Sequence, residues 1–340
     1  MRLRKAITVA FSAVLLLAGA TLCAHAEDAA TAQCSGADML AELAVTDPAA
    51  HTKVVDQAKA LGNTEALLWK VEKAGLKTSY LFGTMHLTDT RITTLSAKVT
   101  EALSQSEKLV LEVGDLSQEA LVAAMAAAGA DLIYADGRTL ADQLTADEFA
   151  KVTSLVSASG MPGDFARMLK PWLVSTLLSM SECERRQVAS GRKVLDMKLA
   201  EVAKGRNIPV VGLESINEQL NALSGVPEDQ QIQMLRVGLK YADRTDDMME
   251  TMLQMYLTRR MGEAMPFQVA LASKIGVPAT AFDGFQKSLL VDRNARMSKT
   301  AAPILEKGNA FIAVGALHLP GKTGLVTLLR TAGYTVTAVE

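Results

Sequence analysis

The sequence predicts an α/β protein with a mixed central sheet, flanking helices and a substantial helical insertion. Apolar runs of strand length alternate with segments of helical periodicity. Two of these runs lead into the same turn, Gly-x-x-His-Leu, at 83–87 and at 315–319. The turns contain His86 and His318, two of the four histidines in the chain. Because α/β folds place ligands where strands leave the sheet, we predict that the two turns build one paired site.

The N-terminal residues have the pattern of an export signal. Three basic residues precede an apolar stretch at 7–20, and Ala24-His25-Ala26 matches the A-x-A cleavage signature. We therefore predict a signal peptide at 1–26, cleaved near Ala26, and a periplasmic or secreted product. The weaker alternative is a lipoprotein anchored at Cys23, since Leu22 stands where a lipobox normally has Gly or Ala.

Charge and hydropathy narrow the classes of partner. The 35 basic and 37 acidic residues give a net charge of -2, and loss of the signal makes the chain more acidic still. This balance disfavours nucleic acid and anionic membranes. Charged residues interrupt each later apolar run, so we expect no transmembrane segment after the signal. A homodimer is compatible with the sequence, and residues 27–340 are long enough for a single large domain.

Cys34 and Cys183 are the cysteines that follow the signal. In an oxidising compartment two cysteines most simply form one disulfide, which is the pairing we expect. The alternative is a catalytic thiol at Cys183. It is less attractive because Glu182 and Glu184 flank this position and carboxylates disfavour a thiolate.

The strands are predicted in order along the chain. Residues 65–82 form a hairpin that turns at Ala74-Gly75 and delivers His86. The buried run 108–111 ends in Glu112, and the run 208–213 ends in Glu214. At the C-terminus, the order is strand 310–314, helix 323–332 and strand 334–339, which implies a parallel crossover.

Helical patterns fill the regions 115–205 and 217–300, which we expect to pack on the core or cap it. A capping box begins one helix at Thr145. Four methionines follow helical spacing at Met248, Met249, Met252 and Met255. This stripe is either a thioether copper site or a core-facing stripe, and the spacing alone favours the core.

Two imidazoles with one or two carboxylates form a suitable set of ligands for a divalent transition metal. The candidate ligands are His86, His318 and Glu112, and the candidate metals are Mn, Co, Zn and Fe. Such a metal polarises a carbonyl and activates water, while a carboxylate outside the metal shell removes a proton. Glu112 and Glu214 are the candidates for that base. The competing interpretation is that each histidine only hydrogen-bonds the backbone, but repetition of the whole turn favours a site.

These residues and their order resemble the TraB/GumN family, which is related to the Tiki proteases and more remotely to ChaN-like and erythromycin-esterase-like proteins. The resemblance runs from about Cys34 to Glu340. Its strongest pieces are Leu68-Trp69-Lys70-Val71, residues 80–87, Val110-Leu111-Glu112, Asp196 with residues 211–215, Asp292-Arg293-Asn294 and residues 314–321.

The resemblance implies an α/β core in which both Gly-x-x-His turns and an acidic residue form the active site, as in metal-dependent proteases. By position, His86 and His318 match the histidines and Glu112 matches the glutamate. Glu214 and Arg293 lie in matching segments and are carried over as catalytic candidates. Asn294 is a candidate for ligand contact, and Asp196 for positioning a helix.

Three classes of function therefore follow from the sequence. The first is an exported metal-dependent hydrolase, acting on a peptide or a small molecule. The second is a non-catalytic periplasmic protein that binds a metal or haem through the same histidines. The third is a partner-binding protein with a silent site, which uses the methionine-rich helical region as its contact surface.

Overall fold

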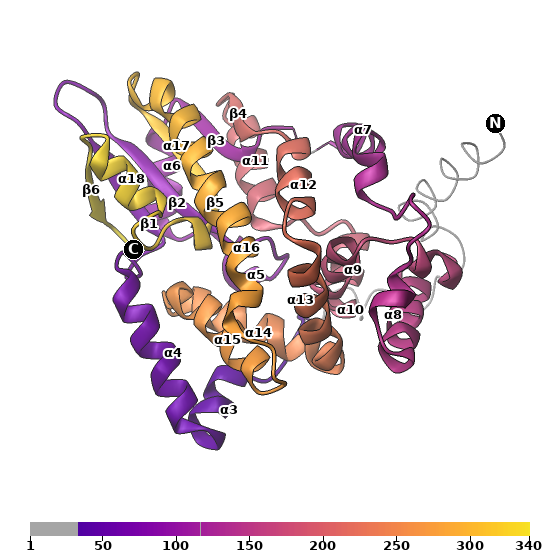
Figure 1. The fold of residues 1–340 in the computed structure, drawn as a ribbon. Coiled ribbons are helices and arrows are strands. Elements are labelled where there is room, and N and C mark those ends of the chain that lie inside the picture. The colour runs from indigo at the N-terminus through magenta and orange to yellow at the C-terminus, as the bar shows by residue number, and fades with distance from the viewer. Residues whose placement is uncertain (1–32, 116) are drawn as a thin grey trace.

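The computed structural model contains a six-stranded mixed sheet, with the larger part of the helical region lying to one side of it (Figure 1). The structure describes residues 33–115 and 117–340, so the signal peptide predicted at 1–26 lies outside the described residues. The strand order is β4-β3-β5-β2-β1-β6. The bounds are β1 Leu68–Glu72, β2 Ser79–Thr84, β3 Lys108–Val113, β4 Val210–Glu214, β5 Ala310–Gly315 and β6 Thr335–Ala338.

Four neighbouring strands of this sheet are parallel. β3 pairs parallel with β4 and with β5, and β5 pairs parallel with β2. β1 lies antiparallel to β2, as the predicted hairpin requires, and β6 lies antiparallel to β1. The mixed α/β class predicted from the sequence is therefore confirmed. Because β2 to β5 run in one direction, their carboxyl ends lie at the same edge of the sheet.

Both faces of the sheet are covered by helices, which explains why β3 and β5 are continuous apolar runs. On one face, Leu109 and Phe311 belong to a core that includes residues of α6 (Ala97–Gln105) and α11 (Leu195–Gly205). On the other face, Val110 and Ile312 belong to a core with α17 (Asp292–Leu305) and α18 (Leu325–Thr331). Glu112 follows Val110 by two residues and so shares its face, toward α17.

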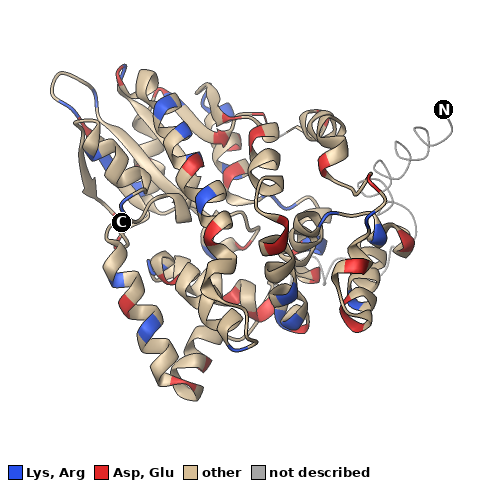
Figure 2. Ribbon diagram, viewed as in Figure 1, with Lys and Arg blue, Asp and Glu red and all other residues tan. Residues whose placement is uncertain are grey.

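The remaining helices lie in the connections, in both regions where the sequence predicts them. Between β3 and β4 the chain forms α7 Gln118–Ala128, α8 Ala146–Ala158, α9 Pro171–Leu178, α10 Glu182–Ala189 and α11. Between β4 and β5 it forms α12 Ile216–Ser224, α13 Glu228–Lys240, α14 Thr245–Leu257, α15 Ala264–Ser273, α16 Asp283–Phe285 and α17. The N-terminal helices α3 Met39–Thr46 and α4 Pro48–Leu61 precede the sheet, and the short α5 Thr90–Thr93 follows β2. Charged residues of both signs are interspersed along these helices (Figure 2).

Part of the helical region has an apolar core of its own. Val152 of α8, Trp172 of α9 and Leu235 of α13 are buried together in a cluster that contains no strand residue. The capping box at Thr145 is present at the start of α8. On α14, Met255 is fully buried and Met252 packs against the main core, as the core interpretation of the methionine stripe expects. No helix among the described residues is long and apolar enough to cross a membrane.

Cys34 and Cys183 form a disulfide across a sequence separation of 149 residues, the pairing favoured by the sequence. The bond ties the segment before α3 to the first turn of α10. The next residue, Glu184, is buried and accepts hydrogen bonds from the backbone nitrogen of Thr88 at 2.7 Å and from its hydroxyl at 3.0 Å. The disulfide-bonded helix therefore also holds the segment that follows His86.

Candidate functional site

Four residues singled out by the sequence lie at or just beyond the carboxyl ends of four adjacent parallel strands. Glu112 lies in β3, Glu214 ends β4, His86 follows β2 by two residues and His318 follows β5 by three. The strands run β4-β3-β5-β2 without interruption. The structure therefore brings the two Gly-x-x-His turns and the two carboxylates to one edge of the sheet.

Gly315 marks the point on which three of these side chains converge. A methyl carbon built on Gly315 would lie 3.2 Å from Oε1 of Glu112, 3.6 Å from Cδ2 of His318 and 3.9 Å from Nε2 of His86. The backbone nitrogen of Gly315 also donates to Oε1 of Glu112 at 2.6 Å. A glycine here leaves the space among the three side chains open.

The imidazole of His86 is oriented by a carboxylate from α11. Nδ1 of His86 donates to Oδ2 of Asp196 at 2.7 Å, and the hydroxyl of Thr84 donates to Oδ1 at 2.8 Å. The protein atoms around the ring partly desolvate it and so oppose its protonation, but the hydrogen bond and charge of Asp196, with the charge of Glu112, raise the pKa of His86 to about 9, so the ring is protonated at pH 7. The side chain is 59% exposed, so Nε2 is accessible.

His318 is oriented by an amide in place of a carboxylate. His318 is the last residue of the short helical turn Ala316–His318, and its ring is buried. The amide nitrogen of Asn294 donates to the carbonyl of Thr323 at 2.9 Å, which leaves Oδ1 of Asn294 to accept from Nδ1 of His318 at 2.7 Å. Burial lowers the pKa of His318 to about 4, so the ring is neutral at pH 7. The lone pair on Nε2 faces Oε1 of Glu112 at 3.5 Å.

Arg293 connects the two buried glutamates. It lies near the start of α17, directly after the π-helical turn Gln286–Val291, a helix type often found at functional sites. Its Nη2 donates to Glu112 at 2.6 Å, and its Nε donates to Glu214 at 3.0 Å and 3.2 Å, with a further short contact from Nη2 to Glu214. The amide of Gln219 donates to both carboxylates, at 2.9 Å and 3.0 Å.

This environment keeps Glu112 ionised. Burial raises the pKa of a carboxyl group, but the positive charges of Arg293 and His86 and the hydrogen bond from Gly315 outweigh it and hold the pKa of Glu112 well below its usual range. One oxygen, Oε2, is held by Arg293 and Gln219, whereas Oε1 faces the histidines. The side chain of Glu214 is 1% exposed, and its oxygens accept from Arg293 and Gln219.

The donor set can be compared with the needs of a divalent metal. Within residues 33–115 and 117–340, no three His, Cys, Asp or Glu side chains form a ready-made metal site. The chemistry of the facing groups nevertheless fits a cation, because Nε2 of neutral His318 and Oε1 of ionised Glu112 are both acceptors and point at each other. Nε2 of His86 borders the same space. A cation there would be held by Nε2 of His318 and Oε1 of Glu112, and Nε2 of His86 would join them on losing its proton.

Sequence reasoning missed two residues of this network. Thr84, which shares Asp196 with His86, and Gln219, which bridges the two glutamates, were not singled out. Gln219 lies in the first turn of the helix that begins just after Glu214. A polar residue at this distance from a carboxylate at a strand end is the sequence feature that could have indicated the contact. Asp196 was expected to position a helix, whereas its carboxylate orients His86.

The fold and the site together define an α/β protein that gathers two histidines, two glutamates and an arginine at the carboxyl edge of parallel strands. The model of the TraB/PrgY/gumN family matches residues 67–338, and the chain belongs to this family. The resemblance noted from the sequence is thereby confirmed.

Several curated relatives are distant in sequence. The chain is 21% identical to metalloprotease TIKI2 of Danio rerio, over 84% of this chain and 63% of that protein. It is 22% identical to metalloprotease TIKI1 of Xenopus tropicalis, over 80% of this chain and 61% of that protein. It is 21% identical to uncharacterized protein YbaP of Shigella flexneri, over 75% of this chain and 89% of that protein. The chain therefore spans less than two thirds of the length of the metalloproteases. No solved structure matched the chain.

Proposed function

We propose that the protein is an exported metal-dependent hydrolase that cleaves peptide bonds. The observation that carries this proposal is the convergence of His86, His318 and Glu112 around Gly315. The class of reaction is supported by the relatives named metalloproteases, which the chain matches over most of its own length. Export is supported by the disulfide, because such bonds persist in oxidising compartments.

The metal ligands in this proposal are Nε2 of His86, Nε2 of His318 and Oε1 of Glu112. A bound Mn, Co, Zn or Fe ion would supply a Lewis acid and an activated water. The protein residues orient these ligands. Asp196 and Asn294 occupy the Nδ1 side of each ring, which leaves both Nε2 atoms for the metal. Arg293 holds Oε2 of Glu112 and so aims Oε1 at the histidines.

The sequence analysis names Glu214 as a candidate for the base, but in this proposal Glu214 has a different role. Its carboxylate is buried and accepts from Arg293 and Gln219, so it has no oxygen free to take a proton from water. We assign Glu214 to holding Arg293 in place. Arg293 in turn offsets one of the two negative charges of the glutamates, and the negative charge that remains favours a bound cation.

The test uses the purified mature chain, residues 27–340, with its disulfide intact. Metal content is measured by elemental analysis, and hydrolysis of a mixed peptide library is followed by mass spectrometry with and without each metal. We expect metal-dependent cleavage that is lost in His86→Ala and in His318→Ala. The matched control is His51→Ala, which removes a histidine of α4 outside the site. Unchanged metal-dependent cleavage in His86→Ala would refute the proposal.

The same proteins separate the other two functions. A non-catalytic metal carrier would bind the ion through both histidines without cleaving any peptide. A haem protein would develop a Soret band on titration with haem and lose it in His318→Ala. A partner-binding protein with a silent site would keep its cellular phenotype in both histidine variants and lose it when accessible methionines of α14 are replaced.

A further inference from the structure

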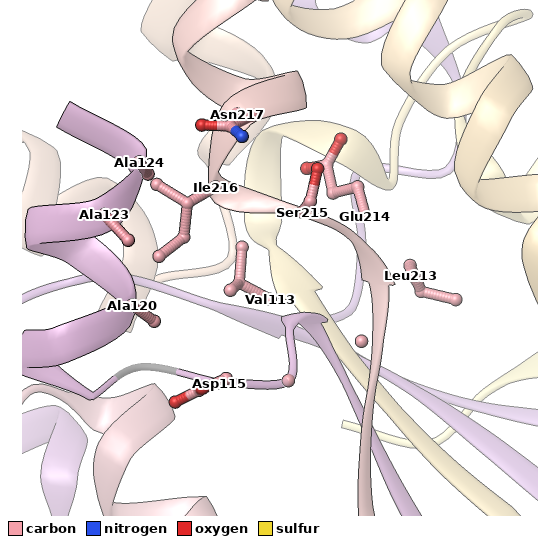
Figure 3. Close-up of a pocket in the computed structure, with 12 residues that line it drawn as sticks. Val113, Asp115, Ala120, Ala123, Ala124, Leu213, Glu214, Ser215, Ile216 and Asn217 are labelled. Carbon is pink, nitrogen blue, oxygen red and sulfur yellow. The ribbon is translucent and has the colours of Figure 1, made fainter. Parts of the chain in front are cut away.

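A second feature of the same sheet edge is a cavity of about 560 Å³ at the carboxyl ends of β3 and β4. It lies between α7 and the start of α12, with Ala120, Ala123 and Ala124 on one side and Ile216 on the other (Figure 3). Glu214 lines the cavity and also binds Arg293, so the cavity adjoins the candidate site.

Two of the residues that line the cavity, Gly114 and Gly212, approach each other closely. A methyl carbon on Gly114 would lie 2.5 Å from the backbone nitrogen of Gly212, and one on Gly212 would lie 2.5 Å from that of Gly114. The ends of β3 and β4 thus approach backbone to backbone. Small residues on the α7 wall extend the opening, so the volume is available to a large group.

The chemistry of the lining indicates an uncharged, apolar occupant. Val113, Leu213 and Ile216 join the alanines, and the described residues that line the cavity include no lysine or arginine. The start of α12 is already capped, because Ser215 accepts from the backbone nitrogen of Glu218 and the Glu218 carboxylate accepts from that of Ser215. This helix end therefore offers little to an anion. The exposed Asp115 at the lining further disfavours an acidic group.

We propose that this cavity binds an aliphatic side chain of the peptide substrate, an inference that rests on the function proposed above. The distance between neighbouring strands indicates which residue of the peptide would enter the cavity. The cavity lies at β3 and β4 and the histidines follow β5 and β2, about two strand spacings or ~10 Å away. An extended peptide advances about 3.3 Å per residue, so the bound side chain lies about three residues from the cleaved bond.

The experiment fills the cavity and varies the side chain that should enter it. Ala123→Trp and, independently, Ala120→Trp place an indole on the α7 wall. Ala123 is exposed, which makes its substitution compatible with folding. The matched control is Ala126→Trp, on an exposed part of α7 that does not line the cavity. The peptides carry Leu, Gly or Asp three residues from the bond that the native protein cleaves.

We expect both filling variants to raise KM for the Leu peptide about tenfold, the loss expected when one aliphatic side chain stays in water. Their kcat should stay unchanged, and the Gly peptide should be cleaved equally by all proteins. The native protein should bind the Leu peptide more tightly than the Asp peptide. Equal losses for the Leu and Gly peptides, or no loss for either, would overturn the inference.

Binding measured without hydrolysis separates this inference from the proposed function. Fluorescence anisotropy in the presence of a chelator reports the affinity for labelled Leu, Gly and Asp peptides spanning ten residues. A preference for Leu that Ala123→Trp abolishes and Ala126→Trp preserves supports the cavity even if no peptide is cleaved. Cleavage with no preference among the three peptides would leave the proposed function standing and remove the cavity as a subsite.

Discussion

Nδ1 of His86 lies 2.7 Å from Oδ2 of Asp196, although 110 residues separate them in the sequence. The pair joins the loop after β2 to α11 and fixes which ring nitrogen of His86 faces the site. Thr84 donates to the second oxygen of Asp196, so both oxygens of this carboxylate have a partner. A carboxylate in this position orients an imidazole and increases its strength as a metal ligand.

Replacement of this carboxylate should weaken the metal site without unfolding the protein. Asp196→Asn keeps the shape of the side chain but removes its charge and one of its two acceptors. We expect metal affinity to fall about 10- to 100-fold, the usual effect of losing the partner of a histidine ligand. Isothermal titration calorimetry with Zn or Mn measures the change. Asp229→Asn, at an exposed position of α13, is the control and should bind metal normally.

Gly315→Ala should close the site from within. The backbone angles of Gly315, φ -52° and ψ 135°, are accessible to alanine, so the fold should persist. The added methyl group would occupy the space bounded by Glu112, His318 and His86. We expect at least roughly tenfold weaker metal binding, because displacing a ligand should cost no less than losing the hydrogen-bond partner of one, which costs about 10- to 100-fold. Gly205→Ala, which meets open space, is the matched control. Normal metal binding by Gly315→Ala would show that the three side chains do not bind the same metal ion.

Arg293→Ala should cost stability as well as function. Removal of the guanidinium leaves the buried carboxylates of Glu112 and Glu214 without their cation. Breaking a buried ion pair by removing one partner costs about 3–5 kcal/mol. Urea unfolding followed by circular dichroism measures the loss. Arg186→Ala breaks an exposed pair with Glu182 and should cost about 0–1 kcal/mol. Comparable losses in the two variants would contradict the structural role assigned to Arg293.

Glu112→Gln and Glu214→Gln should separate the roles of the two glutamates. Glu112→Gln removes the charge of the oxygen that faces the histidines, so metal binding and hydrolysis should both be lost. Glu214→Gln weakens the contact with Arg293 but leaves Oε1 of Glu112 in place. The free energy of unfolding should therefore fall, while metal-dependent hydrolysis should be largely retained. Metal titration and urea unfolding on both variants measure the contrast. Complete loss of hydrolysis in a stable Glu214→Gln protein would restore Glu214 as the base.

Because Arg91 pairs with Asp89, the free energy of unfolding should decrease as the pH falls into the acidic range. Burial raises the pKa of Asp89, but hydrogen bonds from Arg91 and Gln33 outweigh it and lower the pKa. A lowered pKa in the folded state means that Asp89 stabilises the protein above its unfolded pKa of about 4, and that this contribution is lost as the pH falls further. Asp89→Asn should therefore reduce the unfolding free energy at pH 7 more than at pH 3. Urea unfolding at both pH values tests the sign, and a constant difference would refute it.

The strands and their terminal residues were predictable from the sequence because they depend on local patterns. The hairpin, the run ending in Glu112 and the C-terminal strand, helix and strand are each marked by apolar periodicity and glycine turns. The same periodicity placed His86 and His318 beyond strand ends. Their arrival at one edge followed from parallel strand direction, a property of the fold class.

The contacts that orient the site were not predictable in the same way. Asp196 contacts His86 across 110 residues, and Asn294 contacts His318 from the first turn of α17. No local pattern records such pairings, because a polar residue on a helix looks the same whether it faces water or a buried ring. The cavity beside β4 depends on the approach of Gly114 and Gly212, which the sequence shows only as two glycines.

The disulfide is coupled to the candidate site through the loop that follows β2. Cys183 is adjacent to Glu184, and Glu184 holds Thr88, two residues after His86. Any free energy that oxidation contributes to ordering this loop would therefore also act on an ion held by His86, as proposed above. Such linkage is reciprocal. If His86 binds a metal as proposed, oxidation should tighten metal binding, and bound metal should make the disulfide harder to reduce by the same factor.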